Sequence, residues 1–480
     1  MRLGLDIGTS GVKAVLVSPE HQVIGQASAG LSVSRLASGH AEQSPQSWLD
    51  ACVQCMDELH AHYPQFRDLR AIGLSGQMHG ATLIDDQDQV IRDCMLWNDT
   101  RAWREAGALN QYPQVHQRSA NWIFPGFTSP KLNWLRTHEP ASFERIHKVL
   151  LPKDYVRLFL SGEYLTDLSD ASGTGWLDVS QRRFSKTLLA HSGLELQHMP
   201  GCVEGSDPAG QLRDALAQRW GLNHPVMIAG GAGDNAATAC GLGITQPGQG
   251  FVSLGTSGVL FTPTARCLPA VEQAVHAFCH ALPQSWHHMG VTLSAADSLS
   301  WWCGILGVTP AQALAQLPAS LDGPTTVKFL PYLGGERTPH NDSQIRGQFA
   351  QLEQATSQAD MTQAVLQGVA FSLLDCLQAL TQAGSQVDRL IAAGGGSASG
   401  LWLQMLADVL QREICVPQES GSIAALGAAS LAARAIGEFE PTRSPSITQT
   451  YVPNPALAEA YARAHLDYQA LYHNNKRDIG

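Results

Sequence analysis

The string Gly-Thr-Ser-Gly-Val occurs twice in the chain, starting at Gly8 and again at Gly255, about half of the 480 residues later. Each copy lies between two runs of β-forming residues, which is typical of two strands joined by a tight turn. One copy alone is most simply a hairpin turn, because Gly and Ser favour turns wherever they cluster. Two copies at this spacing favour a duplicated domain, which constrains the fold more than any other feature of the sequence.

The composition limits the classes to which the chain can belong. Lys and Arg number 31 against 42 Asp and Glu, so the net charge is −11, and 44% of the residues are hydrophobic. We therefore expect a globular protein of about two or three domains, with neither nucleic acid nor membrane as its partner. The chain starts without a signal-peptide pattern, no stretch approaches the ~18 apolar residues of a membrane helix, and the ten cysteines form no disulfide framework. A reduced, cytoplasmic protein is expected.

Strand and helix patterns alternate in both halves, which predicts an α/β fold with helices packed on a sheet. The first half has predicted strands over residues 3–7, 12–17, 23–27, 71–74 and 226–229, and predicted helices from Pro45 (capped by Ser44) and over 131–137, 155–160 and 236–243. The second half has predicted strands over 390–393 and 414–416 and helices over 361–380, 401–410 and 423–436. The turn-rich residues 246–250 are the candidate boundary, so the predicted domains are 1–246 and 247–480.

The chain lacks the best-known nucleotide-binding motifs, namely the GxxxxGK[ST] loop, the GxGxxG turn and the HRD and DFG pair of protein kinases. The two GTSG turns offer another device, because small residues let backbone N–H groups and Thr hydroxyls converge on a phosphate. Asp6, two residues before the first turn, is suited to Mg²⁺ rather than to phosphate. The second copy has Ser253 at that position, which predicts one active site between two halves that each supply a turn.

Asp234 stands at the predicted start of a helix, directly after the Gly-rich residues 230–233. A carboxylate there can take a proton from a substrate hydroxyl in a site between two domains. It can also be an ordinary helix N-cap, since Asp is among the best capping residues. Position alone leaves both interpretations open.

Other polar segments allow both a binding and a structural interpretation. His79, in the string Gln-Met-His-Gly after a predicted strand, suits a ligand-facing loop or a structural role. Trp97-Asn98-Asp99 and the segment from Glu336 to His340 could bind a polyol or close an ion pair. Cys52 and Cys55 have a redox-like spacing, but they share the apolar face of a predicted helix and are expected to be buried structural residues.

The chain resembles the FGGY family of carbohydrate kinases, within the superfamily of sugar kinases, hexokinase, actin and Hsp70, over about its first 440 residues. The matching strings are DIGTSGVK, SGQMHGATL, LWNDTR, GFTSPKL, LLPKDYVR, DLSDASGT, GDNAA, SLGTSGV, FLPYLGGERTPH and AAGGGSASG. Among them, GQMHG is the most specific, because glycerol kinases of the same fold differ there. The resemblance implies two ribonuclease-H-like domains with a cleft between them, the first mainly for sugar and the second mainly for ATP.

The implied reaction is phosphorylation of a ketose, D-xylulose, to its 5-phosphate by Mg-ATP. Asp234 would be the general base, Asp6 would organise Mg²⁺, and Met78, His79, Asp234 and Asn235 would contact the sugar. Gly8, Thr9, Gly255 and Thr256 would hold the phosphates, and Gly395, Gly396 and Ser399 would lie against adenosine. Many relatives have Asn where this chain has Ser399, so the amide that could touch adenine is missing.

Two alternatives remain at this stage. A kinase of the same fold for ribulose, fuculose or glycerol would keep the base and the nucleotide residues, but its loops around residues 77–80 and 97–98 would select another substrate. A non-catalytic ATP or sugar sensor would need neither Asp6 nor Asp234, so the presence of both disfavours it. The predicted helix over residues 455–474 could pack on its own chain or form the interface of a homodimer.

Overall fold

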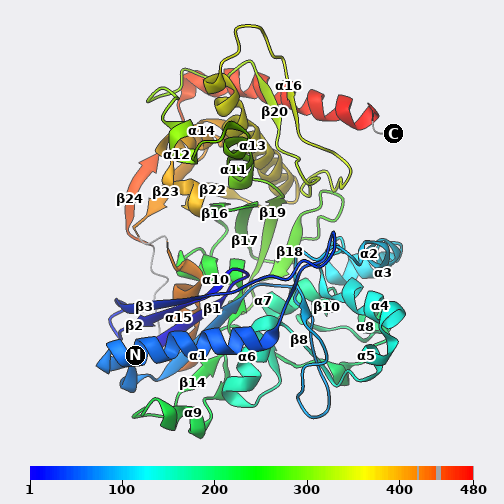
Figure 1. Cartoon of the computed structure of the whole chain (residues 1–480), viewed down its shortest axis with the longest axis vertical. Helices are drawn as coiled ribbons and strands as arrows, with labels where there is room; N and C mark the ends of the chain where they lie inside the picture. The colour runs from blue at the N-terminus through cyan, green and yellow to red at the C-terminus, as the bar shows by residue number, and fades with distance from the viewer. Residues whose placement is uncertain (419–420, 439–444, 479–480) are drawn as a thin grey trace.

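The computed structural model describes residues 1–418, 421–438 and 445–478. Within these residues each half of the chain forms a seven-stranded mixed sheet, and smaller two-stranded sheets lie around them. Figure 1 shows the N-terminal sheet in the lower part of the molecule and the C-terminal sheet in the upper part. The α/β fold with two bodies predicted from the sequence is confirmed.

The N-terminal sheet is built around the first hairpin. Its spatial order is β13 (Pro208–Gln211), β14 (Met227–Ala229), β5 (Ala71–Gly76), β1 (Arg2–Ile7), β2 (Gly11–Val17) and β3 (Val23–Gly30), and β15 (Ala232–Gly233) also pairs with β5. β1 runs antiparallel to β2 and parallel to β5, and β14 is parallel to β5 but antiparallel to β13.

The C-terminal sheet repeats this arrangement. Its order is β18 (His276–Cys279), β19 (Trp286–Thr292), β17 (Gly258–Thr264), β16 (Gly248–Leu254), β22 (Val387–Ala393), β23 (Glu413–Pro417) and β24 (Ile447–Tyr451). β16 is antiparallel to β17 and parallel to β22, and β23 is parallel to β22 but antiparallel to β24. Both GTSG turns therefore join equivalent hairpins, and the duplication predicted from the repeated string is confirmed by the topology.

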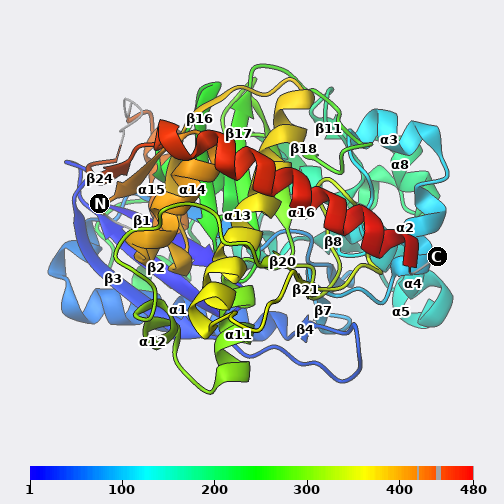
Figure 2. The ribbon, with the colours of Figure 1, turned by 90° about the horizontal axis from the view of Figure 1, so that it is seen from above.

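Helices cover the outer face of each sheet, since every second strand residue there is apolar. On the N-terminal sheet, α1 (Pro45–His62) and α6 (Pro152–Ser161) share a core with Leu3, Leu5 and Ile7 of β1. On the C-terminal sheet, α11 (Ala296–Leu306), α13 (Gln358–Gln382), α14 (Gly400–Leu410) and α16 (Ala458–Asp478) share a core with Val252 and Leu254 of β16. Figure 2 shows α16 lying across the top of this layer.

The helix α15 (Ile423–Ala435) belongs to the second half of the chain but packs on the N-terminal sheet, where Figure 1 shows it in orange among blue strands. A Cβ on Gly4 or Gly73 would lie 1.8 Å from a carbonyl oxygen of α15, so only glycine admits the helix this closely. Its neighbour α10 (Asp234–Gly241) crosses it at a similar distance, because a Cβ on Gly427 would lie 1.8 Å from the carbonyl oxygen of Ala237. At the C-terminal end of α10, Ala239 and Leu242 share an apolar cluster with Phe251 and Ile391 of the C-terminal sheet.

The sequence also predicts an insertion in the first half, over about residues 98–222. Most of the remaining elements lie in it, while the others precede it or belong to the second half. They include β4 (Glu42–Gln43), β6 (Thr82–Ile84), β7 (Cys94–Met95), α2 (Trp103–Leu109), α3 (Pro113–Ser119), α4 (Thr128–His138), α5 (Pro140–Glu144), β8 (Lys148–Leu150), β9 (Leu165–Asp167), α7 (Leu168–Ala171), β10 (Leu177–Asp178), β11 (Arg183–Phe184), α8 (Lys186–His191), β12 (Gly201–Val203), α9 (Asp214–Arg219), α12 (Pro310–Leu314), β20 (Lys328–Leu330) and β21 (Gln348–Ala350). Cys52 and Cys55 are buried on α1, as expected.

Three local predictions differ from the structure. Ser44 occupies the N-cap position of α1, but its side chain makes no capping hydrogen bond. Residues 248–250, placed in the boundary turn, are the first residues of β16, because they pair with β22. The sequence predicts a loop at the three glycines from Gly394, but the last two of them begin a short 3-10 helix, Gly395–Ala398.

The C-terminal helix α16 packs on its own chain. Tyr461, Tyr468 and Tyr472 are buried in the core of the second half, and His465 Nε2 lies 2.8 Å from a carboxylate oxygen of Asp375. Among the described helices, α13 is the one long and apolar enough to span a membrane by length and composition, but 83% of its apolar window is buried inside the fold. This helix therefore reads as a core helix.

Candidate functional site

Asp6 lies on the inner face of the N-terminal sheet, the face that meets α15 and α10. It alternates with Leu5 and Ile7, which point into the outer core, so the period of the strand turns its carboxylate inward. Ser75, its register partner on β5, donates its hydroxyl to Asp6 Oδ1 at 2.8 Å. Burial raises the pKa of Asp6 although this hydrogen bond opposes the shift. Ser253 holds the equivalent place on β16, so only one half offers a carboxylate there.

Asp234 is the first residue of α10, and the N-cap position belongs to Gly233. The interpretation of Asp234 as an ordinary N-cap is therefore wrong, because the cap lies one residue earlier. Its Oδ1 accepts from the backbone N–H of Asn235 at 2.7 Å and from the side-chain amide of Asn235 at 3.0 Å. Burial and the nearby charge of Asp6 raise the pKa of Asp234 to about 7. A carboxylate with this pKa is matched to proton transfer at neutral pH.

The two GTSG turns differ in what their threonines do. Thr9 donates its hydroxyl to Gln77 Oε1 at 3.0 Å and accepts from Trp97 Nε1 at 3.0 Å, so that hydroxyl is used inside the protein. Thr256 is exposed, and its hydroxyl makes no hydrogen bond to the described residues. The first turn thus joins the site to the Gln77 loop, whereas the second turn exposes the side chain of Thr256.

The glycines from Gly394 lie against the second turn. A Cβ on Gly394 would come within 2.9 Å of the Gly255 nitrogen, and one on Gly396 would lie 2.8 Å from Leu254 Cβ. Gly395, in contrast, has open space where its Cβ would be. Ser399 caps α14 by accepting from the Trp402 N–H at 3.3 Å, so its hydroxyl already serves the helix. The structure thus brings these predicted residues next to Gly255.

Met78 and His79 lie on the loop after β5, beside the segment that leads to Asp234. A Cβ on Gly233 would lie 2.8 Å from Met78 Cγ, so Met78 packs directly against this segment. His79 Nδ1 lies 2.7 Å from the carbonyl oxygen of Gly173, which can only accept, so Nδ1 carries the proton. Burial lowers the pKa of His79 to about 3, which keeps the ring neutral. Its Nε2 is therefore an acceptor for a hydroxyl.

Two side chains of α4 hold this loop, and the sequence assigned neither of them a role. Lys131 donates its ammonium to the carbonyl oxygen of His79 at 2.9 Å, and Thr128 donates its hydroxyl to the same oxygen at 3.2 Å. His79 needs this support because it has a positive φ of 69°, which is unfavourable for a residue with a side chain. Burial lowers the pKa of Lys131 to about 7. Their only sequence signal was the matched string GFTSPKL.

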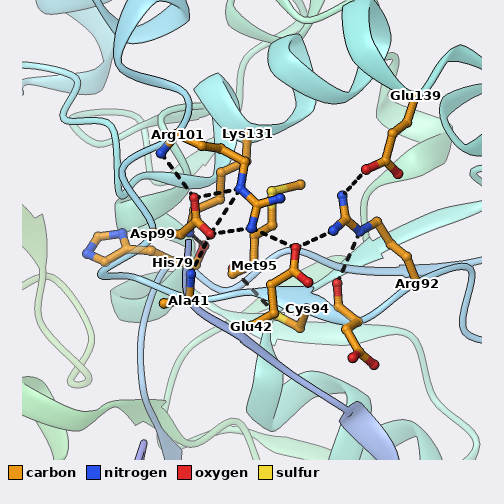
Figure 3. A network of polar contacts seen from close by, with 11 residues as sticks. Ala41, Glu42, His79, Arg92, Cys94, Met95, Asp99, Arg101, Lys131 and Glu139 are labelled. Carbon is orange, nitrogen blue, oxygen red and sulfur yellow. Dashed lines mark hydrogen bonds and ion pairs between the residues drawn. The ribbon is translucent and has the colours of Figure 1, made fainter. Parts of the chain in front are cut away.

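Asp99 closes an ion pair rather than facing a ligand, which decides one of the alternatives left open. It is fully buried, and Arg101 Nη2 lies 2.6 Å from its carboxylate. Figure 3 shows that Arg101 also reaches Glu42, which in turn binds Arg92. This network ties Glu42 of β4 to the loop that carries Trp97, whose indole reaches Thr9.

A fully buried charge cluster supports the segment before Asp234. Lys153 pairs with Asp154, Asp167 and Asp170 at 2.6 to 3.3 Å, all without solvent exposure of their side chains. Asp167 accepts from the Ser169 hydroxyl, and that hydroxyl accepts from the Gly233 N–H at 3.2 Å.

Arg157, one turn along α6, donates to the carbonyl oxygens of Ala229 and Gly230 at 2.8 and 2.5 Å. Three hydrogen bonds, two from Arg157 and one to the Ser169 hydroxyl, thus hold the chain between Ala229 and Gly233. These residues came from the strings LLPKDYVR and DLSDASGT, to which the sequence assigned no role.

The carboxylate pair suits a divalent cation that arrives with a phosphate ligand. Among residues 1–418, 421–438 and 445–478, no group of three or more His, Cys, Asp or Glu side chains could hold a metal ion. Mg²⁺ is commonly held by one or two carboxylates, with phosphate oxygens and water at its other positions. The charge of Asp6 raises the pKa of Asp234, so a cation beside the pair would relieve their repulsion.

The chain matches family models over most of its length. Residues 1–241 match the N-terminal domain of the FGGY family of carbohydrate kinases, and residues 250–436 match its C-terminal domain.

Individual relatives cover nearly all of both chains. The chain is 40% identical to a xylulose kinase of Escherichia coli over 98% of each chain, and 44% identical to one of Klebsiella pneumoniae over 90% of this chain and 89% of that protein. A solved structure described as a "xyloylose kinase" from Brucella ovis is 50% identical and superposes with a TM-score of 0.96, covering 98% of each chain. A xylulose kinase structure from Rhodospirillum rubrum, 27% identical, superposes with a TM-score of 0.90 over 99% of each chain. The repeated hairpins, the inward carboxylates and these full-length matches together place the chain in the FGGY family of carbohydrate kinases.

Proposed function

We propose that the chain transfers the γ-phosphoryl group of Mg-ATP to the terminal hydroxyl of D-xylulose, giving D-xylulose 5-phosphate and ADP. The observation that carries the proposal is Asp234, whose pKa of about 7 suits a base, which is close enough to Asp6 for their charges to interact, and which directly follows the residue that packs against Met78. The matches to xylulose kinases over nearly the whole chain support the choice of sugar.

Asp234 acts as the general base in this reaction. Asn235 fixes the orientation of one carboxylate oxygen with two hydrogen bonds, which leaves the other free to face the sugar. As the sugar oxygen attacks the γ-phosphorus, its proton passes to Asp234, and the bond between the γ-phosphorus and the bridging oxygen breaks so that ADP leaves. Met78, His79 and Asn235 hold the ketose, and Nε2 of the neutral His79 accepts a hydrogen bond from one of its hydroxyls.

The nucleotide lies along the second half in this proposal. Gly8 and Gly255 supply turn backbone to the phosphates, with Thr9 and Thr256 beside them, and Gly395, Gly396 and Ser399 face adenosine. The open space at Gly395 and the exposure of Thr256 support this arrangement. Mg²⁺, held by Asp6 and the phosphates, would neutralise charge on the transferred group. Catalysis then depends on positioning and charge more than on covalent chemistry.

The test is release of ADP in a coupled assay with Mg-ATP. The panel is D-xylulose, L-xylulose, D-ribulose, L-ribulose, L-fuculose, glycerol and no sugar. A strong preference for D-xylulose supports the proposal. Preference for another member would keep the base but move the specificity, and no stimulation by any sugar would favour a sensor.

Further proposals concern the cellular location, the domain division and the oligomeric state of the enzyme. We place it in the cytoplasm, because all ten cysteines are free, and burial raises the pKa of nine of them above the ordinary thiol value, as expected for structural thiols. The division into a sugar domain (1–246) and an ATP domain (247–480) and the homodimer stay predictions. Because α16 is packed on its own core, a dimer formed through this helix would have to use the outer face of the helix.

A further inference from the structure

Arg337 belongs to the second half of the chain, yet it lies beside the sugar loop of the first. The edge strand β18 docks on the first half, where the Asn121 side chain donates to the carbonyl oxygen of Ala277 at 2.9 Å and accepts from its N–H at 3.0 Å. This docking places His276 5.8 Å from the Phe127 ring, which stacks on His79 at 4.6 Å. Arg337 Nη1 reaches His276 Nε2 at 3.4 Å, so it joins the same cluster.

The backbone that carries Arg337 is rigidly held. Glu336 accepts from the Thr292 hydroxyl at 2.5 Å, the Leu293 N–H at 2.9 Å and the Arg337 N–H at 2.6 Å. On the other side, Thr338 donates its N–H to Val291 at 3.0 Å and its hydroxyl to Ala274 at 2.8 Å. A group fixed in this way needs little reorganisation to bind a ligand.

The guanidinium itself has few partners. It carries five N–H donors, but its one polar side-chain contact among the described residues is the long one to His276. Its flat face lies 4.7 Å from the centre of the Phe124 ring, and no carboxylate of the described residues forms an ion pair with it. The Arg337 side chain is only partly buried, so its remaining donors are accessible and available to an oxygen-rich ligand that enters beside it.

The position of Arg337 indicates which end of a bound ligand its guanidinium can reach. After burial, the main cause, the charge of Arg337 also lowers the pKa of both His79 and His276. The pKa of Asp234 is shifted by burial, Asp6 and Asn235 instead. The contacts agree, because Arg337 is linked to His79 through His276 and the Phe127 ring, and none of its contacts among the described residues is with Asp6 or Asp234.

We propose that Arg337 is a specificity-determining residue that donates to the 1-hydroxyl and the 2-keto oxygen of the ketose, the end opposite the hydroxyl that Asp234 deprotonates. The inference rests on the proposed ketose kinase function.

The test compares D-xylulose with 1-deoxy-D-xylulose, which lacks the 1-hydroxyl, in wild type, Arg337→Met and Arg337→Lys. Hydrogen bonds to a charged donor are worth about 10- to 100-fold in binding. We expect Arg337→Met to lower kcat/KM for D-xylulose by that factor, mainly through KM, with the KM for ATP unchanged. The wild-type preference for D-xylulose over the deoxy sugar should fall toward one in Arg337→Met and partly return in Arg337→Lys.

Arg182→Met is the matched control, because Arg182 pairs with Glu204 of its own half and joins the halves through the Ser285 carbonyl, but lies outside this cluster. It should lower the melting temperature without changing the sugar preference. If Arg337→Met does not fold, Arg337→Lys alone must still reduce the preference. An unchanged preference in a folded Arg337 variant overturns the inference, whereas a wild type inactive on D-xylulose refutes the proposed function first.

Discussion

The proposed mechanism depends on the carboxylate of Asp234, which takes the proton of the sugar hydroxyl. We expect Asp234→Asn to lower kcat by roughly 10²-fold or more, because the amide cannot accept the proton of the sugar hydroxyl. The same change should raise stability at pH 8. Burial holds the folded pKa near 7, above the ordinary value of 3.8, so ionisation costs folding free energy as pH rises through that range. Melting curves should show a higher melting temperature for Asp234→Asn than for wild type at pH 8, and a smaller difference at pH 4. Retained turnover in the folded variant would show that Asp234 is not the general base.

Asp6 should set the pH at which Asp234 becomes active. Its charge raises the pKa of Asp234, so Asp6→Asn should lower that pKa and move the acidic limb of kcat/KM to lower pH. The profiles are compared after normalising each to its own plateau, since Asp6→Asn should also weaken use of Mg-ATP. The exposed Asp50 of α1 offers the control, and Asp50→Asn should leave the limb in place. A limb that does not move in Asp6→Asn contradicts electrostatic coupling of the two carboxylates.

The crossing of α10 and α15 is the element that fixes the start of α10, and therefore Asp234. A Cβ at Gly427 would overlap the carbonyl oxygen of Ala237, so Gly427→Ala must push the helices apart. We expect it to destabilise the protein by about 1–3 kcal/mol or more in urea unfolding, with a lower kcat. Gly304→Ala on α11 is the matched control. It has nothing within 4 Å of the added Cβ and should be neutral or stabilising by up to about 1 kcal/mol. Equal effects of the two changes would refute the close crossing.

The first half of the chain needs a helix from the second half to cover its sheet. Because α15 from residues 423–435 packs on β1 and β5, a fragment ending at residue 246 lacks the helix that covers the inner face of its own sheet. We expect the fragment 1–246 to aggregate or to lack cooperative unfolding when expressed alone. Co-expression with 247–480 should restore a soluble complex, as seen by size-exclusion chromatography. A monomeric 1–246 fragment with a sharp thermal transition would show that the first half folds independently.

Most of the elements could be predicted because their signals are local. The alternation of Leu3, Leu5 and Ile7 with polar or small residues predicted β1, and the glycines of the GTSG turns predicted both hairpins. Errors arose at element ends, as at residues 248–250, where pairing with β22 extends the strand into a turn-like sequence. Pairing between distant strands leaves no local pattern, so residue order alone cannot show it.

The sequence by itself determined the class of fold, the duplication and the chemical types of the site, because strand periodicity, turn residues and the motif strings are all local. The tertiary structure alone decided how those residues are used. It paired the Thr9 hydroxyl with Gln77 and Trp97, gave Lys131 the carbonyl oxygen of His79, and brought Arg337 into the His79 cluster. Each of these contacts joins residues 52 to 88 positions apart, and such contacts depend on how the sheets and helices pack around the whole core.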